Sequence, residues 1–498
     1  MRHVHHPGEA DPRSILVILP TWVGDFVMAT PTLRAVRTRF ADARITFLIE
    51  PNLVELARGG DWMDELIEWP GKDRRSPLHK EYRRVVAQLR HRRFDWAVLL
   101  SNSFRSALIA RLAGIKRRIG YDRDGRGLLL TDRLPVKNRR GRGKAQSSFI
   151  LHPSSFVPAP PGRFTPMPLV EYLADLAEAI GCERPGHRLE LFVTPDCDSA
   201  VEQRLTSLGM ADHRPLVVIA PGAKYGASKC WPVERFAAVA DRLIENEKAA
   251  VVVACGPGEE SLARELGSAI RAHGKPPLPI EGEGGPAPLP LSPEGRGVLA
   301  SLASLEGRGV LDGGAQSCAS DYAAGPRGLN PAARAEGVGP SPLPLSLEGR
   351  GVLPVPLSPG GGGVLAPPVS LEGRGVLERK LTGKWFIFDS PRLTLGELKS
   401  LVKRSDLLLC NDTGPRHLAK AFEVPVVTVF GPTHPEWTAT DYEAERIVRI
   451  DADCGPCQQR VCPLGHLKCM TGVTIDAVYE AARELLRSRV AHSELQTR

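Results

Sequence analysis

The sequence has few aromatic residues, no long apolar run and no apolar segment near its start. Aromatic residues make up 6% of the 498 residues, and they do not alternate with the basic stretches as in a single-strand nucleic-acid platform. No run approaches the roughly 20 apolar residues of a membrane-spanning helix. The opening MRHVHHPGEADPRS is polar and lacks the apolar core of an export signal. We therefore expect a globular cytoplasmic protein without a transmembrane segment and without a nucleic-acid partner.

Positive charge is the main bias in composition. Lysine and arginine number 65 against 57 acidic residues, which gives a formal net charge of +8. The basic residues are densest in the first third of the chain, in residues 72–93 and 137–144. Such an excess taken alone suits any anionic partner: a nucleic acid, a phosphate-bearing substrate or an acidic membrane surface. Solvated helix and loop faces explain the same residues, and both interpretations stay open.

Four of the ten cysteines form a cluster. The other six are scattered, several of them within apolar stretches, as expected of reduced and buried thiols. The cluster has the spacing C-x2-C-x4-C-x6-C and consists of Cys454, Cys457, Cys462 and Cys469. Such a set could hold a structural zinc ion, although the order of a zinc ribbon is absent. Reduced thiols or disulfides are the alternatives, and we expect no catalytic metal.

Residues 276–379 differ in composition from the rest of the chain. They are rich in proline, glycine, serine and leucine, and a short unit close to SLEGRGVL recurs in them. The unit has too few large apolar residues to form the packed face of a solenoid repeat. We therefore predict a low-complexity, disordered surface insertion without a catalytic role.

The remaining chain repeats a short apolar strand, a rim rich in glycine, proline, serine or asparagine, and an amphipathic helix. This alternation predicts an α/β fold with doubly wound parallel sheets and crossover helices. We expect two domains, the first in residues 14–185 and the second in residues 186–275 and 380–490. Ligands bind such sheets beyond the carboxyl ends of the strands, which is where the unusual residues of this sequence fall.

One rim has the sequence NDTGPRHL. Asp412 or Thr413 could cap the helix that follows, and Gly414 permits close approach of the backbone. The free amides at the start of this helix would form an anion site, and His417 could point at the same anion. The pattern indicates a phosphate site, with a plain capping loop as the alternative.

Two other rims carry charged residues. Lys229 comes just before a predicted helix and is flanked by glycines, which suits a phosphate clamp. Glu259 and Glu260 follow a glycine turn, GPGEE, and either could bind ribose hydroxyls. A solvated lysine and helix-capping glutamates are the alternatives.

The first predicted domain has a candidate proton acceptor. Asp25 lies between a buried strand and a helix and could take a proton from a hydroxyl group. Capping of its own helix is the alternative. Arg105 and Arg118 fall on the same side of the domain and suit an anionic acceptor.

Four segments are distinctive when they are taken together and in order: PTWVGDFVMATPTL, PGAKYGASKCWPVERFAAVA, NDTGPRHLAKAFEVPVVTVFGPTHPEWT and CGPCQQRVCPLGHLKCM. Together they resemble the ADP-heptose:lipopolysaccharide heptosyltransferases of glycosyltransferase family 9, and most closely the heptosyltransferase II branch. The resemblance covers residues 14 to about 487 except the insertion.

The resemblance implies a GT-B fold, in which two Rossmann-like domains face a cleft. The first domain would bind the lipid A core acceptor and the second the nucleotide-sugar donor. The reaction would be an inverting, metal-independent transfer of heptose from ADP-L-glycero-D-manno-heptose to the inner core of lipopolysaccharide. No cofactor is expected, because ADP-heptose is a substrate.

The resemblance also implies roles for single residues. Asp25 would be the catalytic base, and Lys229 would contact the donor phosphates. The ribose carboxylate maps to Glu259 or Glu260. The donor-binding loop matches Asp412, Thr413, Gly414 and His417.

The lipid of the acceptor would place the enzyme at the inner face of the inner membrane. Two other functions stay open. The same scaffold could use another nucleotide sugar or acceptor, such as a UDP-sugar donor. A non-enzymatic nucleic-acid or scaffold protein would explain the charge and the cysteines, but not the four rims.

Overall fold

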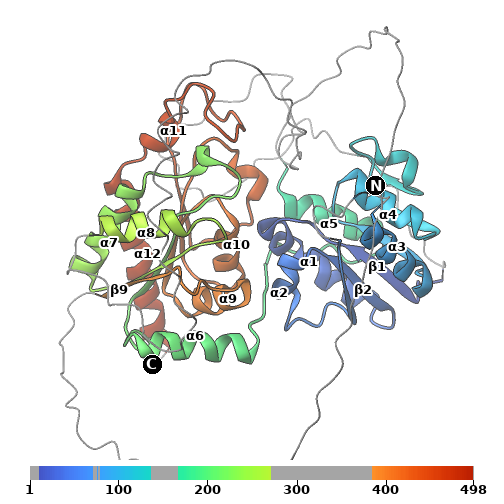
Figure 1. Ribbon diagram of the computed structural model, residues 1–498, viewed down its shortest axis with the longest axis horizontal. Coiled ribbons are helices and arrows are strands. Elements are labelled where there is room, and N and C mark those ends of the chain that lie inside the picture. The colour runs from blue at the N-terminus through green and yellow to red at the C-terminus, as the bar shows by residue number, and fades with distance from the viewer. Residues whose placement is uncertain (1–9, 71–75, 77–78, 136–166, 271–383, 497–498) are drawn as a thin grey trace, which may run out of the picture. The chain divides into compact units, whose positions relative to one another are not determined.

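The computed structural model describes residues 10–70, 76, 79–135, 167–270 and 384–496 (Figure 1). The predicted insertion, 276–379, lies outside the described residues. The described strands form two six-stranded parallel sheets within one compact unit of the chain. None of the described helices is long and apolar enough to cross a membrane.

The first sheet has the strand order β3-β2-β1-β4-β5-β6, and every neighbouring pair is parallel. Its strands are β1 (Ser14–Ile18), β2 (Arg44–Ile49), β3 (Glu65–Glu68), β4 (Trp96–Leu99), β5 (Arg117–Tyr121) and β6 (Asp132–Leu134). The accompanying helices are α1 (Val23–Arg39), η1 (Pro51–Leu53), α2 (Val54–Ala57), α3 (Lys80–Arg92), α4 (Phe104–Leu112), η3 (Arg126–Leu129) and α5 (Leu169–Ala179).

The second sheet has the order β12-β11-β10-β7-β8-β9 and is also parallel throughout. Its strands are β7 (Leu216–Ala220), β8 (Ala250–Ala254), β9 (Lys384–Phe388), β10 (Leu407–Asn411), β11 (Val426–Val429) and β12 (Glu445–Val448). Its helices are α6 (Pro195–Ser207), η4 (Ala227–Lys229), α7 (Val233–Glu247), α8 (Glu260–Ala269), α9 (Leu395–Arg404), α10 (Gly414–Ala421), η7 (Pro435–Thr438), α11 (Lys468–Thr471) and α12 (Ile475–Gln496).

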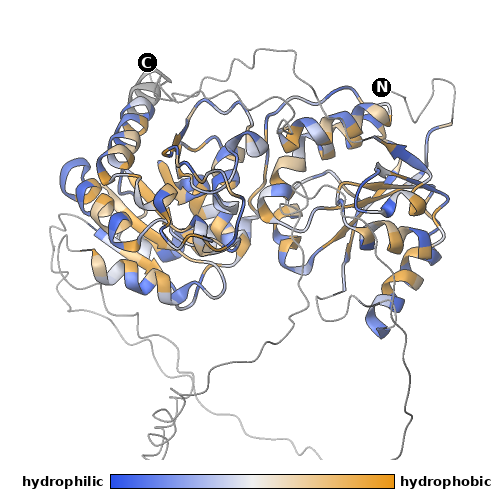
Figure 2. Cartoon of the chain, turned by 90° about the horizontal axis from the view of Figure 1, so that it is seen from above, coloured by the Kyte–Doolittle hydropathy of each residue, from blue (hydrophilic) through white to orange (hydrophobic). Residues whose placement is uncertain are grey.

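The strands are apolar on both faces because helices cover both faces of each sheet. In β1, Ile15 and Val17 belong to one hydrophobic cluster, whereas Leu16 and Ile18 belong to another. Side chains alternate between the faces of a strand, so a strand buried on both sides is apolar throughout. Figure 2 shows the hydrophobic residues concentrated on the strands and on the helix faces turned toward them.

The two sheets have the same topology. Counted along the chain, the strands of each sheet follow the order 3-2-1-4-5-6 or its reverse, which is the doubly wound order of dinucleotide-binding folds. The order reverses between β1 and β4 in the first sheet and between β7 and β10 in the second. Ligands of such sheets bind beyond the carboxyl ends of the strands at these switch points. The predicted α/β class with doubly wound parallel sheets is therefore confirmed.

Candidate active site

Asp25 lies in the first turn of α1, just beyond β1 at the first switch point. Trp22 is the N-cap of this helix and no side chain caps it, so capping does not occupy the carboxylate. Within the described chain, no residue forms a hydrogen bond or ion pair with the Asp25 carboxylate. Burial raises the pKa of Asp25 to about 6, although the positive charge of Lys229 lowers it. A carboxylate of this kind can accept a proton near neutral pH.

The loop between β10 and α10 carries the residues of the first predicted rim. Thr413 is the N-cap of α10, but no side chain caps the helix. The prediction that Asp412 or Thr413 caps it was therefore wrong, because both side chains turn elsewhere. The Thr413 hydroxyl donates to the carbonyl oxygen of Asn411 at 3.3 Å. The first amides of α10 consequently have no side-chain acceptor and present the positive end of the helix dipole.

The Asp412 carboxylate joins the two loops at the second switch point. Its Oδ2 lies 2.5 Å from Lys229 Nζ, in the loop after β7. The Thr433 hydroxyl donates to the same oxygen at 2.8 Å. Burial would raise the pKa of Asp412, but the positive charges of Lys229 and Arg416 outweigh it and hold that pKa well below its usual range. Asp412 is therefore a permanent anion that fixes Lys229 beside the start of α10.

Asn411 ties the same two loops together. Its amide nitrogen donates to the Pro221 carbonyl at 2.6 Å, and its oxygen accepts from the Trp231 amide at 3.1 Å. The predicted phosphate residues of the two rims thus share one rigid frame, with Lys229 between Pro221 and Trp231 in the chain.

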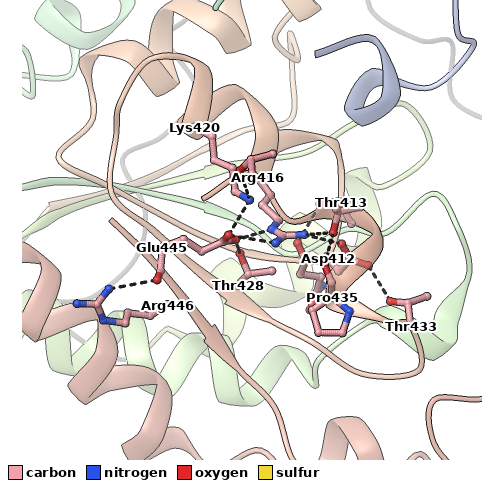
Figure 3. A network of polar contacts seen from close by, with 12 residues as sticks. Asp412, Thr413, Arg416, Lys420, Thr428, Thr433, Pro435, Glu445 and Arg446 are labelled. Carbon is pink, nitrogen blue, oxygen red and sulfur yellow. Dashed lines mark hydrogen bonds and ion pairs between the residues drawn. The ribbon is translucent and has the colours of Figure 1, made fainter. Parts of the chain in front are cut away.

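A buried network of ion pairs adjoins Asp412 and the start of α10 (Figure 3). The Arg416 guanidinium donates to both carboxylate oxygens of Glu445, and its Nη1 lies 3.3 Å from Asp412 Oδ1. Lys420 Nζ lies 2.6 Å from Glu445 Oε2. Burial would raise the pKa of Glu445, but the charges of Arg416 and Lys420 lower it to about 2. Burial and the charge of Arg416 lower the pKa of Lys420 to about 8.

The sequence analysis did not identify this network. Asp412, Arg416 and Lys420 are spaced four residues apart, so one face of α10 carries Arg416 and Lys420 and Asp412 lies just before the helix on the same side; this spacing was a usable signal. Glu445 comes from β12, and nothing in its local sequence points to its partners. With Lys229, the network has three cations and two carboxylates, which leaves one positive charge near the helix start.

His417 is buried beneath the same helix start. Burial and the charges of Arg416 and Lys420 hold the pKa of His417 well below its usual value, so the imidazole is neutral. Its Nδ1 has no hydrogen-bond partner among the described residues. A neutral ring can donate or accept a hydrogen bond at the site but supplies no positive charge to an anion. Its predicted contact with the donor stays a prediction.

Two glycines let α1 and α10 come close together. A Cβ atom on Gly24 would lie 2.9 Å from the His417 ring, and a Cβ atom on Gly414 would lie 2.8 Å from a methyl carbon of Val23. Only glycine fits such contacts without displacing its neighbour. The start of α1, which carries Asp25, is thereby held against the start of α10.

The two candidate ribose ligands differ in their surroundings. Glu259 Oε2 accepts from the Gly256 amide at 2.8 Å, and its carboxyl group fills the space that a Cβ atom on Gly222 would occupy. Glu260 instead pairs with Arg392 at 2.7 Å. The Glu259 carboxylate thus lies at the rim of β7, in the same loop region as Lys229, which makes it the better candidate.

The predicted acceptor residues also differ. Arg105 is exposed at the start of α4 and forms no ion pair with any residue of the described chain. Arg118 donates to the carbonyl oxygens of Leu129 at 2.6 Å and Ile115 at 2.5 Å. Its guanidinium is therefore occupied by backbone, whereas that of Arg105 is available. Both acceptor roles stay predictions.

The four clustered cysteines line one small cavity together with His466. All four are free thiols, and Cys454 Sγ lies 3.9 Å from His466 Nε2. Burial and the neighbouring thiols raise the pKa of Cys469. Among the described residues, no group of three or more such ligands is arranged to hold a metal ion. A structural zinc ion and reduced thiols both stay predictions for this cluster.

The fold is that of an α/β protein with two Rossmann-like sheets, and Lys229 and Asp412 meet at the second switch point. Comparison with known proteins gives the family. The family model of glycosyltransferase family 9 (heptosyltransferase) matches residues 82–155, 163–274 and 381–468. The chain belongs to this glycosyltransferase family. The match leaves out residues 275–380, a range that includes the predicted insertion.

Curated relatives carry related names. Lipooligosaccharide heptosyltransferase 2 of Campylobacter jejuni is 37% identical over 98 residues, which cover 20% of this chain and 31% of that protein. Lipopolysaccharide heptosyltransferase 2 of Salmonella typhimurium is 29% identical over 263 residues, which cover 52% of this chain and 68% of that protein. The chain thus spans about one to two thirds of the length of these relatives.

A solved structure supports the fold. The structure of Escherichia coli ADP-heptose LPS heptosyltransferase II matches with a TM-score of 0.57 at 18% identity and covers 95% of this chain and 99% of that chain. At this identity the likeness concerns the fold alone, and it confirms the predicted GT-B class.

Proposed function

We propose that this protein transfers heptose from ADP-L-glycero-D-manno-heptose to the inner core of lipopolysaccharide, with inversion at the anomeric carbon. Relatives of this chain are named lipooligosaccharide or lipopolysaccharide heptosyltransferase 2, and the site residues suit the chemistry. The observation that carries the proposal is the close packing of the start of α1, which carries Asp25, against the start of α10, beside which Asp412 holds Lys229.

The donor half of the reaction needs positive charge for a leaving diphosphate. Lys229 and the uncapped amides of α10 supply it. Asp412 holds Lys229 in place, and Glu259 takes the ribose hydroxyls. In this proposal these groups, without a divalent cation, stabilise the charge that develops as the bond between heptose and ADP breaks.

The acceptor half needs a proton acceptor beside the attacking hydroxyl. Asp25 takes the proton while the hydroxyl oxygen bonds to the anomeric carbon of heptose. The electron pair of the breaking glycosidic bond leaves with ADP. The protonated Asp25 then returns its proton to water. In this proposal, Arg105 contacts anionic groups of the lipid A core at the inner face of the inner membrane.

The direct test is transfer of heptose from ADP-heptose to a heptose-bearing lipid A core in the presence of EDTA. We expect transfer by the wild-type protein and none by an Asp25→Asn variant that still binds ADP-heptose. If the protein bound ADP-heptose but did not transfer heptose to this acceptor, we would infer that another glycan is the acceptor. Preference for a UDP-sugar in a competition experiment would overturn the donor assignment.

A further inference from the structure

Three exposed apolar side chains lie on two contacting elements beside the first sheet, α4 and η3. The large hydrophobic residues exposed in the described structure number six, and three of them fall between residues 104 and 128. Phe104 is 47% exposed, Leu112 is 37% exposed and Leu128 is 86% exposed. Single exposed hydrophobic residues are common on protein surfaces, but several on adjoining elements mark an interaction site.

These residues lie on elements that contact one another. Helix α4 contacts both α3 and η3, and Figure 1 shows α3 and α4 beside each other. Buried Arg126 of η3 donates to the Asn102 side chain at 2.9 Å, which ties η3 to the start of α4. At the other end of α4, Arg90 of α3 donates to the Leu112 carbonyl at 2.7 Å. We refer to the exposed residues of these three elements and of the turn after α4 as the α3–α4–η3 surface.

The α3–α4–η3 surface is also strongly basic. Between residues 80 and 133 the chain has 14 lysines and arginines and 5 aspartates and glutamates, a net +9 against +8 for the whole chain. Two of the acids are neutralised, since Asp124 pairs with Arg123 and Asp132 pairs with Arg117. The exposed cations without an ion pair in the described structure include Arg83, Arg84, Arg111 and Lys116.

We propose that the α3–α4–η3 surface docks the protein onto an anionic lipid bilayer. Cations at such a surface attract acidic headgroups, and Phe104, Leu112 and Leu128 can enter the apolar boundary beneath them. A nucleic-acid backbone would match the charge but would leave two exposed leucines without a partner. The inference adds to the proposed function, because docking would bring the rim with Arg105 to a lipid-linked acceptor. It rests on the surface alone and can be tested without transfer.

The first experiment measures sedimentation of the full chain with vesicles that contain no acceptor lipid. One set is phosphatidylcholine alone, and the other has one part phosphatidylglycerol to three parts phosphatidylcholine. We expect binding to the anionic vesicles that weakens with salt, and weak binding to the neutral ones. A Phe104→Ser/Leu128→Ser variant should bind the anionic vesicles at least about tenfold more weakly, and an Arg84→Ser/Arg111→Ser/Lys116→Ser variant should lose most of the salt dependence.

Matched controls change exposed residues elsewhere. Leu464→Ser removes a side chain that is 62% exposed in the cysteine loop, and Arg487→Ser removes an exposed cation of α12. Both should bind vesicles as the wild type does. Circular dichroism and thermal unfolding of each variant report that it is folded.

Two outcomes would overturn the proposal. They are an absence of binding to anionic vesicles, or equal binding by the surface variants and the wild type. If a folded protein bound the vesicles but transferred no heptose, the proposed function would be contradicted and the proposed docking surface would still be supported.

Discussion

Lys229 Nζ and Asp412 Oδ2 are 2.5 Å apart, and this ion pair joins the loops that follow β7 and β10. The pair holds an ammonium group beside the uncapped start of α10. Because Asp412 already holds Lys229 in one position, the lysine side chain loses little further conformational entropy when a diphosphate binds. This preorganisation favours tight binding.

The first prediction concerns this lysine. Lys229→Met should weaken ADP binding at least about tenfold in calorimetry, because a charge-assisted contact is worth about 1.5–3 kcal/mol. Lys224→Met is the control, since Lys224 is exposed in the same loop and has no contact with Asp412. Unchanged ADP affinity in the Lys229 variant would remove Lys229 from the donor site.

The second prediction concerns the pH dependence of Asp25. The pKa of Asp25 is raised to about 6, so kcat/KM for transfer should rise with pH through about 6 and then level off. Asp25→Asn should lower kcat by about 10²–10⁴ and leave ADP-heptose affinity within about twofold. A rate that stays flat from pH 5 to 8, measured on stable protein, would contradict the role of base.

Asp25 should also affect stability, in the opposite direction to its effect on activity. Its pKa is higher in the folded than in the unfolded chain, so the folded state binds the proton more tightly and loses stability as pH rises from about 4 through 6. Above pH 6 the ionised carboxylate costs about 1–3 kcal/mol. Asp25→Asn should therefore unfold at a higher temperature than the wild type at pH 8, but not at pH 4.

The sequence predicted the fold class well because both sheets depend on local patterns. Apolar strands followed by polar rims and amphipathic helices are visible in the chain, and the wound topology follows from their alternation. Asp25, Lys229 and Asp412 could be predicted as site residues because each follows the carboxyl end of a strand beside a switch point, and their roles stay predictions. Which helix start would be left uncapped was not predictable, since Asp412 turns to Lys229, which lies 183 residues away along the chain. Glu445 was missed for the same reason.

The third prediction separates the two glutamates that the sequence left unresolved. Glu259→Gln should weaken ADP binding about tenfold, because its carboxylate lies at the rim beside Gly222 and would lose charge-assisted bonds to the ribose. Glu260→Gln is the matched control and should bind as the wild type does, because Glu260 is turned toward Arg392. Binding of ADP should be compared by calorimetry with binding of inorganic pyrophosphate, which has the diphosphate but no ribose. If the Glu260 variant alone lost ADP affinity, the assignment would be reversed.

The fourth prediction tests the close approach of α1 and α10. Gly24→Ala should cost about 1–3 kcal/mol of unfolding free energy, because its methyl group would meet the buried His417 ring at 2.9 Å. Gly186→Ala is the control, since a Cβ atom at Gly186 meets nothing within 4 Å. The measurement is urea unfolding, together with the transfer rate below the transition. Equal unfolding midpoints for the two variants would show that the contact with His417 does not constrain position 24.

The last prediction concerns the buried network beneath the site. Glu445→Gln should lower the free energy of unfolding at pH 7 by about 3–5 kcal/mol, because Lys420 loses the carboxylate it pairs with and Arg416 keeps only its contact with Asp412. Lys420→Met added to this variant should restore part of the loss, since it removes the buried cation that Glu445 had neutralised. Glu443→Gln, an exposed neighbour, is the control.

The pH dependence of the Glu445 effect has a definite sign. The pKa of Glu445 is about 2 in the folded chain, below its ordinary value of 4.5, so its stabilising effect is complete above about pH 4.5 and is lost as pH falls toward 2. The difference in unfolding free energy between wild type and Glu445→Gln should therefore shrink over that range in urea titrations. A constant difference from pH 7 to pH 3 would mean that packing, and not the charge of Glu445, holds α10 on β12. In that case the network would not be what keeps Asp412 and Lys229 in position.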